Sequence, residues 1–327
     1  MNGLFAKLSM TELRARQGVC SAQCDTYSCY KGSPATPPEG LATHGCPLHS
    51  HPAQLVDNRD CVLCMTCLKA CPHSSIEVRL RPPAADIWGG GHRPLAAEAA
   101  LQWILLGAVA AHHLPALLSD FGIEPAGVLE PRLAHCAAAA AVLAAPGLVA
   151  WGADAAWRAV AGALAPARAT LAIAGAAGAS PDAARALSVL AAASTSYAGA
   201  AAGVPVVAPQ KPFLDLSYGF LPLTWAATLA HYLAPLLLEA GHALPIAART
   251  FAPLTDALEP LLEPLVFEAN PAVVAFLQGS TLLFGAGASL VLSRRVAGQP
   301  WRTIAPQCAL IAAFTAEAWH LILGAPL

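Results

Sequence analysis

Long apolar runs recur along the chain after residue 95, and each is about as long as a helix that crosses a bilayer. Such a helix needs about twenty mostly apolar residues. Five runs meet this requirement: residues 99–118, 133–151, 218–238, 272–292 and 301–323. Two weaker runs, rich in alanine and glycine, cover 157–177 and 186–208. The pattern predicts an α-helical polytopic membrane domain over residues 95–327, with five or seven helices.

Residues 1–94 follow a different pattern. Nine of the eighteen Lys and Arg residues lie before Leu95. Apolar and polar residues alternate from Ser75 to Arg81, which predicts a short strand. The segment from Trp88 to Pro94 holds consecutive glycines and a proline, which is typical of a linker. We therefore expect a polar N-terminal head over 1–94, joined by this linker to the membrane domain.

Composition supports a bilayer as the main environment of the chain. The sequence is 56% hydrophobic and 12% charged, whereas soluble domains are about a quarter charged. The net charge is −2, which gives no basic surface for a polyanion. We expect contact with lipid and none with nucleic acid.

The basic residues predict an orientation. If the head faces the cytoplasm or stroma, then Lys211 and the loop with Arg294, Arg295 and Arg302 fall on its side, as the positive-inside rule requires. The acidic segments 119–131 and 241–270 fall on the opposite side. Residues 1–16 lack the apolar core of a secretory signal. The expected location is a bacterial inner membrane or a thylakoid membrane.

The most specific motif is a cysteine run that ends at Pro72. Its spacing is C-x2-C-x2-C-x3-C-P, through Cys61, Cys64, Cys67 and Cys71. Bacterial ferredoxins hold 4Fe–4S clusters with this run. Zinc sites usually present two C-x2-C pairs separated by a loop instead. On the side where thiols stay reduced, the run therefore favours iron–sulfur ligation over zinc and over disulfides.

A second cysteine set lies upstream. It consists of Cys20, Cys24, Cys29 and Cys46, and Pro47 follows Cys46 as Pro72 follows Cys71. In two-cluster ferredoxins the fourth cysteine of a run ligates the other cluster. We therefore assign one cluster to Cys20, Cys24, Cys29 and Cys71, and the other to Cys46, Cys61, Cys64 and Cys67. The alternative is an uncrossed arrangement. Since eight cysteines satisfy two clusters, the nearby histidines are expected at the surface or beside the ligands: His44, His49, His51 and His73.

The head resembles the membrane-bound polyferredoxins of the NapH/NosR type, especially a variant in cyanobacteria and related phototrophs. The matching segments are 13–16, 20–32, 45–47, 51–55, 57–60, 61–72 and 79–83. The resemblance implies a bacterial-ferredoxin-like α+β head with two 4Fe–4S clusters, in an accessory protein of a respiratory chain. Beyond the first quarter, the chain matches only as a multi-span membrane domain. Such proteins usually carry helices and a further Cys-x3-Cys-Pro element ahead of this head, so the resemblance also implies a shortened chain or a misassigned start.

Histidines inside the apolar runs are candidates for a second site. Ionisable residues are costly within a bilayer and often functional. His112, His113, His231 and His320 all fall in the half of the membrane farther from the head. They are expected to bind haem b or a quinone. The alternative is that they pair with nearby backbone near the headgroups.

The expected function is membrane-anchored electron transfer between a soluble redox partner and a membrane quinone or partner subunit. Two alternatives remain open. The chain is a non-catalytic subunit of a larger membrane oxidoreductase, or a maturation factor that supplies electrons for cofactor insertion into a metalloenzyme. The motifs leave open whether it acts as an enzyme.

Overall fold

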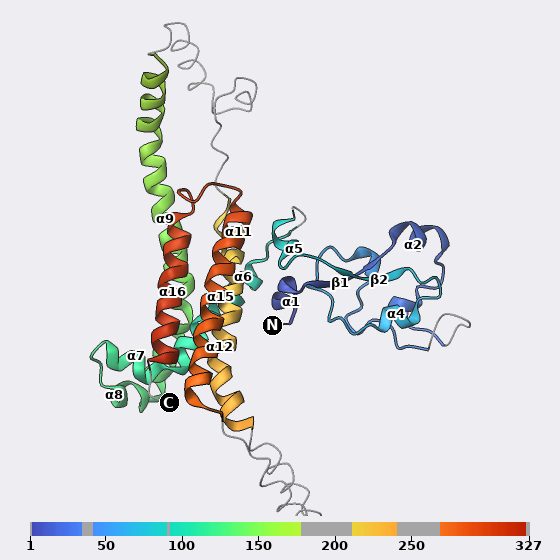
Figure 1. The fold of residues 1–327 in the computed structure, drawn as a ribbon, viewed down its shortest axis with the longest axis horizontal. Helices are drawn as coiled ribbons and strands as arrows, with labels where there is room; N and C mark the ends of the chain where they lie inside the picture. Colours follow the sequence, from blue (N-terminus) through green and yellow to red (C-terminus); the bar gives the residue numbers. More distant parts are fainter. Residues whose placement is uncertain (1, 35–41, 90–91, 178–210, 241–268, 325–327) are drawn as a thin grey trace, which may run out of the picture.

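A computed structural model describes residues 2–34, 42–89, 92–177, 211–240 and 269–324. Figure 1 shows a small head lying beside a bundle of long helices, with the N-terminus at the junction between them. The described residues are mostly helical, and the head contains a two-stranded sheet. The predicted polytopic helical architecture is therefore present in its coarse form.

Short elements build the head. In chain order they are α1 (Asn2–Phe5), η1 (Ala6–Leu8), β1 (Thr11–Ala15), α2 (Gln17–Gln23), α3 (Ser28–Lys31), η2 (Pro52–Gln54), α4 (Thr66–Ala70), β2 (Ile76–Leu80) and α5 (Ala85–Trp88). Strands β1 and β2 pair antiparallel, with Thr11 opposite Leu80 and Ala15 opposite Ile76. β2 confirms the strand predicted from alternation.

One side of this sheet backs the cysteines. Leu13, Ala15 and Ile76 are buried in one cluster with Cys29, Cys67 and Cys71. Successive strand residues point to opposite faces, so the alternation in β1 directs Leu13 and Ala15 inward and leaves Arg14 more exposed. The sheet thus provides an apolar wall for the cysteine-bearing loops.

The remaining elements form the bundle and its connections. They are α6 (Ala96–His112), α7 (Leu114–Asp120), α8 (Pro125–Leu129), α9 (Arg132–Ala177), α11 (Phe213–Ser217), η4 (Tyr218–Phe220), α12 (Leu221–Ala240), α15 (Pro271–Ala297) and α16 (Ala305–Leu323).

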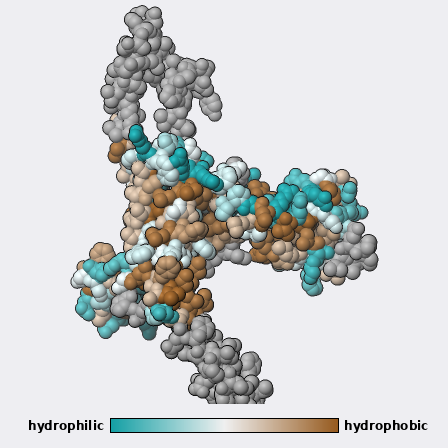
Figure 2. All heavy atoms as spheres, viewed as in Figure 1, coloured by the Kyte–Doolittle hydropathy of each residue, from teal (hydrophilic) through white to brown (hydrophobic). Residues whose placement is uncertain are grey.

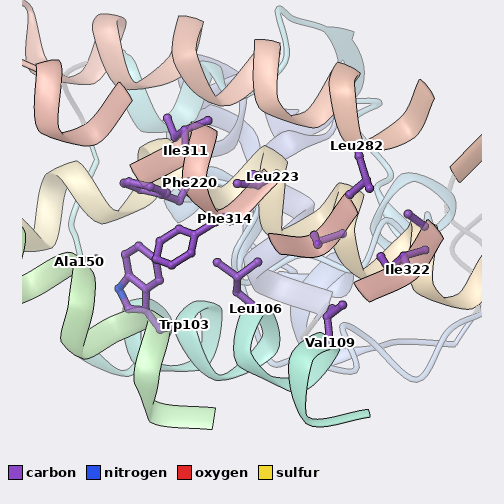
Figure 3. Close-up of a cluster of buried hydrophobic side chains, with 13 residues drawn as sticks. Trp103, Leu106, Val109, Ala150, Phe220, Leu223, Leu282, Ile311, Phe314 and Ile322 are labelled. Atoms are coloured by element: carbon purple, nitrogen blue, oxygen red, sulfur yellow. The ribbon is translucent and has the colours of Figure 1, made fainter. Parts of the chain in front are cut away.

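Aromatic and aliphatic side chains from α6, α9, η4, α12, α15 and α16 meet in the bundle core (Figure 3). The ring centres of Trp103 and Phe220 lie 5.0 Å apart, and Phe314 lies 6.2 Å from Trp103 and 6.3 Å from Phe220. Such tilted and edge-on pairs add to the burial of apolar area. Leu282 and Ile311 complete the same cluster and are essentially inaccessible to solvent.

Three helices in the described part of the chain are long and apolar enough to cross a membrane: Arg132–Ala163, Phe213–Glu239 and Pro271–Ala297. They confirm the runs at 133–151, 218–238 and 272–292. The run at 301–323 forms α16 from Ala305 onward, but α16 is not among these candidates. Gln307, Glu317 and His320 lower its mean hydropathy. The run at 186–208 lies outside the described residues.

Two expected boundaries differ in the structure. The run at 99–118 is broken between α6 and α7, which meet at 75° and count as one bent span if taken together. Pro115 sits in the first turn of α7, where its missing N–H is harmless but α6 cannot continue through it. Conversely, the runs at 133–151 and 157–177 are not separate, since α9 continues through both. Asp154 accepts a hydrogen bond of 2.6 Å from Arg158 one turn later, which supports the continuous helix.

The bundle surface suits a lipid environment. Figure 2 shows hydrophobic side chains along the sides of the bundle, with hydrophilic ones on the outer part of the head and near the bundle ends. Large apolar residues are well exposed on α9 and α15, including Leu148, Leu283, Phe276 and Phe284. In water such residues would be an unusually large apolar patch. The coarse prediction of an integral membrane protein fits this surface.

Candidate metal centre

Short helices and loops hold the eight cysteines of the head. Cys20 lies in α2 and Cys29 in α3, and Cys24 ends α2. Cys67 lies in α4, and Cys71 ends that helix. All eight are free thiols; Cys64 is exposed, whereas Cys29, Cys67 and Cys71 are buried.

One group of thiols lines a small cavity of about 20 Å³ that is backed by Leu13 and Pro52. Its cysteines are Cys46, Cys61, Cys64 and Cys67. The chain therefore folds back so that the upstream Cys46 joins the first three cysteines of the ferredoxin-like run. Cys71, the fourth cysteine of that run, is not part of the lining.

The electrostatic neighbours of two buried thiols follow the same two groups, except that Cys67 also neighbours Cys29. Burial raises the pKa of Cys29 to about 12, with smaller contributions from Cys71, Cys24, Cys67 and Cys20. Burial also raises the pKa of Cys67 to about 11, with contributions from Cys61, Cys64 and Cys46. Only the thiolate is a metal ligand, and a bound cation deprotonates a coordinating thiol outright. These buried thiols therefore become ligands only when a bound group carries enough positive charge to deprotonate them.

The thiols are not arranged around a single ion. Within the described residues, no group of three or more His, Cys, Asp and Glu side chains could hold one metal ion. A cubane of eight atoms holds its four cysteines at separate corners, farther apart than the ligands of a single zinc. Each of the two sets of four thiols has the donor chemistry that a cluster of this kind uses.

The backbone around the thiols is unusual. Tyr27, Leu63 and Met65 adopt left-handed conformations, with φ of 54°, 53° and 60°. Such conformations cost free energy in residues other than glycine and cluster at functional sites. Backbone N–H groups here point at sulfur: Leu63 donates to Sγ of Cys61 at 3.4 Å, and Ser75, which follows the left-handed Ser74, donates to Sγ of Cys71 at 3.3 Å. Hydrogen bonds of this kind favour the charged form of sulfur.

Side chains beyond the cysteines also contact the sulfurs. Ser75 Oγ lies 3.1 Å from Sγ of Cys20, and Thr66 Oγ1 lies 3.3 Å from Sγ of Cys64. His51 Nε2 lies 3.9 Å from Sγ of Cys29, which agrees with the expectation that the head histidines lie beside the ligands or at the surface. The sequence offered no separate signal for Ser75 or Thr66, because hydroxyl residues are common in loops.

A buried ionic group joins the head to the bundle. Lys7, which is fully buried, places Nζ 2.7 Å from a carboxylate oxygen of Glu98 in α6. Arg59 places Nε 2.9 Å from the other oxygen of Glu98. The hydroxyl of Tyr218 in η4 also donates to Glu98 at 2.6 Å, and its ring lies under Lys7 Nζ. Sequence reasoning missed this group; the only signal was an acidic residue at the start of an apolar run.

His92 in the linker completes the same junction. Its ring meets that of Tyr218 edge-on, with centres 4.4 Å apart. Burial, together with the smaller effect of the positive charges of Lys7 and Arg59, lowers the pKa of His92 to about 4. His92 is therefore neutral at neutral pH.

At the opposite end of α6, the structure brings together three of the four membrane histidines. His113 Nε2 and His231 Nδ1 lie 3.3 Å apart, within hydrogen-bonding distance. The ring of His112 stacks on that of His231 at 4.7 Å, beside Tyr232. His320 is elsewhere and pairs with Asp120 at 2.9 Å. We call His112, His113 and His231 the histidine group.

No family model, curated protein or solved structure matches this chain. The resemblance to polyferredoxins thus rests on the cysteine pattern and the segments around it.

Proposed function

We propose that this protein is a membrane-anchored electron carrier with two 4Fe–4S clusters in its head. Cys20, Cys24, Cys29 and Cys71 would hold one cluster, and Cys46, Cys61, Cys64 and Cys67 the other. The observation that carries the proposal is that Cys46 lines one cavity with the first three cysteines of the run, while Cys71 neighbours Cys29. Two sets of four thiols are what two such clusters require.

The residues of the chain would hold and insulate the electron-transfer groups. When bound, the clusters supply one-electron redox chemistry. Burial of Cys29, Cys67 and Cys71 keeps water away from the sulfurs, and the N–H groups of Leu63 and Ser75 offset their negative charge. These are the features that set cluster potentials. Cys64 is exposed, so a soluble redox partner would approach the second cluster at this corner.

Metal and sulfide analysis tests this proposal. Anaerobically purified protein should contain about eight iron and eight sulfide per chain, and the reduced sample should show the coupled EPR signal of two neighbouring clusters. Stoichiometric zinc without sulfide would refute it. Removing the protein from cells separates the carrier from the maturation factor, because loss of a maturation factor depletes one metalloenzyme of its cofactor but leaves bulk electron flux unchanged. Co-purifying proteins would identify the alternative of a subunit without activity of its own.

The histidine group favours a quinone over haem b as the membrane partner. Metal–imidazole bonds are about 2.0–2.1 Å long, so two histidines on opposite sides of one iron need nitrogens about 4 Å apart. His113 and His231 are hydrogen-bonded at 3.3 Å, too close for an iron between them. His112 and Tyr232 are exposed on the bundle side, where a lipid-soluble headgroup could accept a hydrogen bond from an imidazole.

Replacing His231 tests this site. His231→Ala should abolish reduction of the clusters by a quinol analogue while the iron content stays constant. His320→Ala is the matched control, because the His320 side chain is exposed and, among the described residues, pairs with Asp120 rather than with the histidine group. If wild type and His231→Ala reduce their clusters at equal rates, then the bundle serves only to anchor the head in the membrane. If wild type shows a haem spectrum and His231→Ala loses it, then the group bound at this site is haem and not a quinone.

A further inference from the structure

A basic cleft lies where α15 ends and the chain turns toward α16. It is lined by residues 291, 294–295 and 298–301, and none of these is acidic. The guanidinium of Arg294 lies 4.7 Å from the ring centre of Trp301. That of Arg295 lies 4.8 Å from the ring centre of Trp88, at the end of α5. Two stacked guanidiniums therefore face one opening.

Neither of these charges has an acidic partner among the described residues. In the parts of the chain that the structure covers, no carboxylate lies within 4.0 Å of Arg294 or Arg295. By contrast, Arg14, Arg59 and Arg81 in the head each have an acidic partner. Placement at the C-terminal end of a helix favours both cations, but it does not require a cleft or stacking on indoles.

The cleft sits at the level where lipid headgroups are expected. It lies at the end of the candidate span Pro271–Ala297, and Trp residues concentrate at the interface between membrane and water. Basic pockets between membrane helices on the cytoplasmic side bind anionic headgroups. The planar guanidinium binds phosphate through two parallel hydrogen bonds, which an ammonium cannot do.

We propose that this cleft binds the phosphate of an anionic phospholipid through Arg294 and Arg295, while Trp301 and Trp88 hold the guanidinium planes. Val291 lies on the apolar side of the cleft and would contact the start of an acyl chain. The site is independent of the clusters and of the histidine group. It would tie the head to the membrane surface, because Trp88 belongs to the segment that leads out of the head.

Native mass spectrometry of the full chain tests the site. The protein is released from nanodiscs with equal phosphatidylglycerol and phosphatidylcholine, and the retained lipids are counted. Wild type should retain one phosphatidylglycerol in preference to phosphatidylcholine. Each guanidinium near a membrane surface is worth about a fivefold change in affinity, so Arg294→Gln with Arg295→Gln should lose about 30-fold. Arg302→Gln, outside the cleft lining, is the matched control.

Two further measurements distinguish a phospholipid site from a site that binds any anion or that depends on charge alone. Replacing both residues by lysine keeps the charge and the topology but removes the planar fork, so retention should fall to an intermediate value. Inorganic phosphate in millimolar excess should not displace the lipid; displacement would make the site a general anion site and overturn the lipid assignment. Unchanged retention in the double glutamine variant, or an equal loss in Arg302→Gln, would also overturn it.

Discussion

Cys46 and Cys71 are the residues whose partners the sequence spacing alone leaves least certain. Each ends a cysteine set and precedes a proline, so either could complete either set. The fold distinguishes them, because Leu13 of β1 and Pro52 of η2 line the cavity that Cys46 shares with Cys61. Cys71 instead contributes to the electrostatic surroundings of Cys29. The crossed assignment therefore depends on tertiary contacts that spacing can suggest but not establish.

Paired substitutions test the crossing. Serine at Cys71 should remove about half of the iron from wild type. In a Cys24→Ser background, Cys71→Ser should remove little additional iron. Both residues would bind the same cluster, so the two losses would not add. In a Cys61→Ser background, Cys71→Ser should remove nearly all of the remaining iron. The reverse pattern, with Cys71 redundant to Cys61, would establish the uncrossed arrangement.

His92 predicts a pH dependence of stability. Its pKa of about 4 in the folded chain lies below its ordinary value of 6.5. Between these values the folded state binds fewer protons than the unfolded state, so stability rises with pH. The contribution of neutral His92 is fully present above pH 6.5 and is lost as pH falls toward 4.

Thermal unfolding at pH 7 and pH 5 measures this effect. The midpoint should fall at pH 5, and His92→Gln should reduce that fall. His135→Gln serves as control, since His135 is exposed at the other end of the bundle and its side chain lies 3.4 Å from the carbonyl of Leu129. If wild type and His92→Gln lose equal stability on acidification, another group carries the pH dependence.

At the scale of elements, hydropathy predicted where apolar helices lie but not how they end. The apolar runs that form α9, α12 and α15 could be recognised in the sequence, because the lipid-facing and the core-facing positions of these helices are both apolar. The break at Pro115 had a local signal, since a proline lacks the backbone N–H that would continue the hydrogen bonds of the preceding helix. The continuity of α9 had none, because alanine and glycine lower apparent hydropathy without ending a helix. α9 has 46 residues, and at about 1.5 Å per residue it is about 70 Å long. This length is more than twice the ~30 Å hydrocarbon core of a bilayer.

The packing of α12 against α15 depends on one small residue. A Cβ atom added to Gly285 would collide with Cβ of Ala226 and press against the carbonyl of Pro222. Gly285→Ala should therefore destabilise the bundle by about 1–3 kcal/mol, as overpacking does. Gly287→Ala is the matched control on the same helix, because nothing lies within 4 Å of its added Cβ. Equal unfolding midpoints of the two variants in detergent would mean that the helices are not in close contact there.

At the scale of the whole molecule, the junction places the head at a defined end of the bundle. Glu98 at the start of α6 and Tyr218 near the start of the span Phe213–Glu239 both bind Lys7 of the head. Arg295 at the end of α15 meets Trp88. Sequence charge counting predicted this shared side, but the contacts that hold the head there come from residues far apart in the chain.

Cysteine labelling tests the shared side. A cysteine at Thr303, between α15 and α16, should react from the same side of sealed vesicles as one at Arg79 in the exposed part of β2. One at Gly127 in α8 should react from the other side. The background needs Cys136 and Cys308 replaced by alanine. Reaction of the Thr303 and Gly127 positions from one side would contradict the arrangement.

The junction of Lys7, Glu98 and Tyr218 also has a consequence for how the chain is made. Ribosomes add about 5–20 residues per second, so Tyr218 emerges roughly 10–40 s after Lys7. Until then Lys7 lacks the aromatic ring that covers it in the finished protein. The head is thus synthesised first but finished late, after α6 and η4 have entered the membrane. Cells that loaded iron and sulfide during this interval would do so before Lys7 is covered and the head is fixed to the bundle.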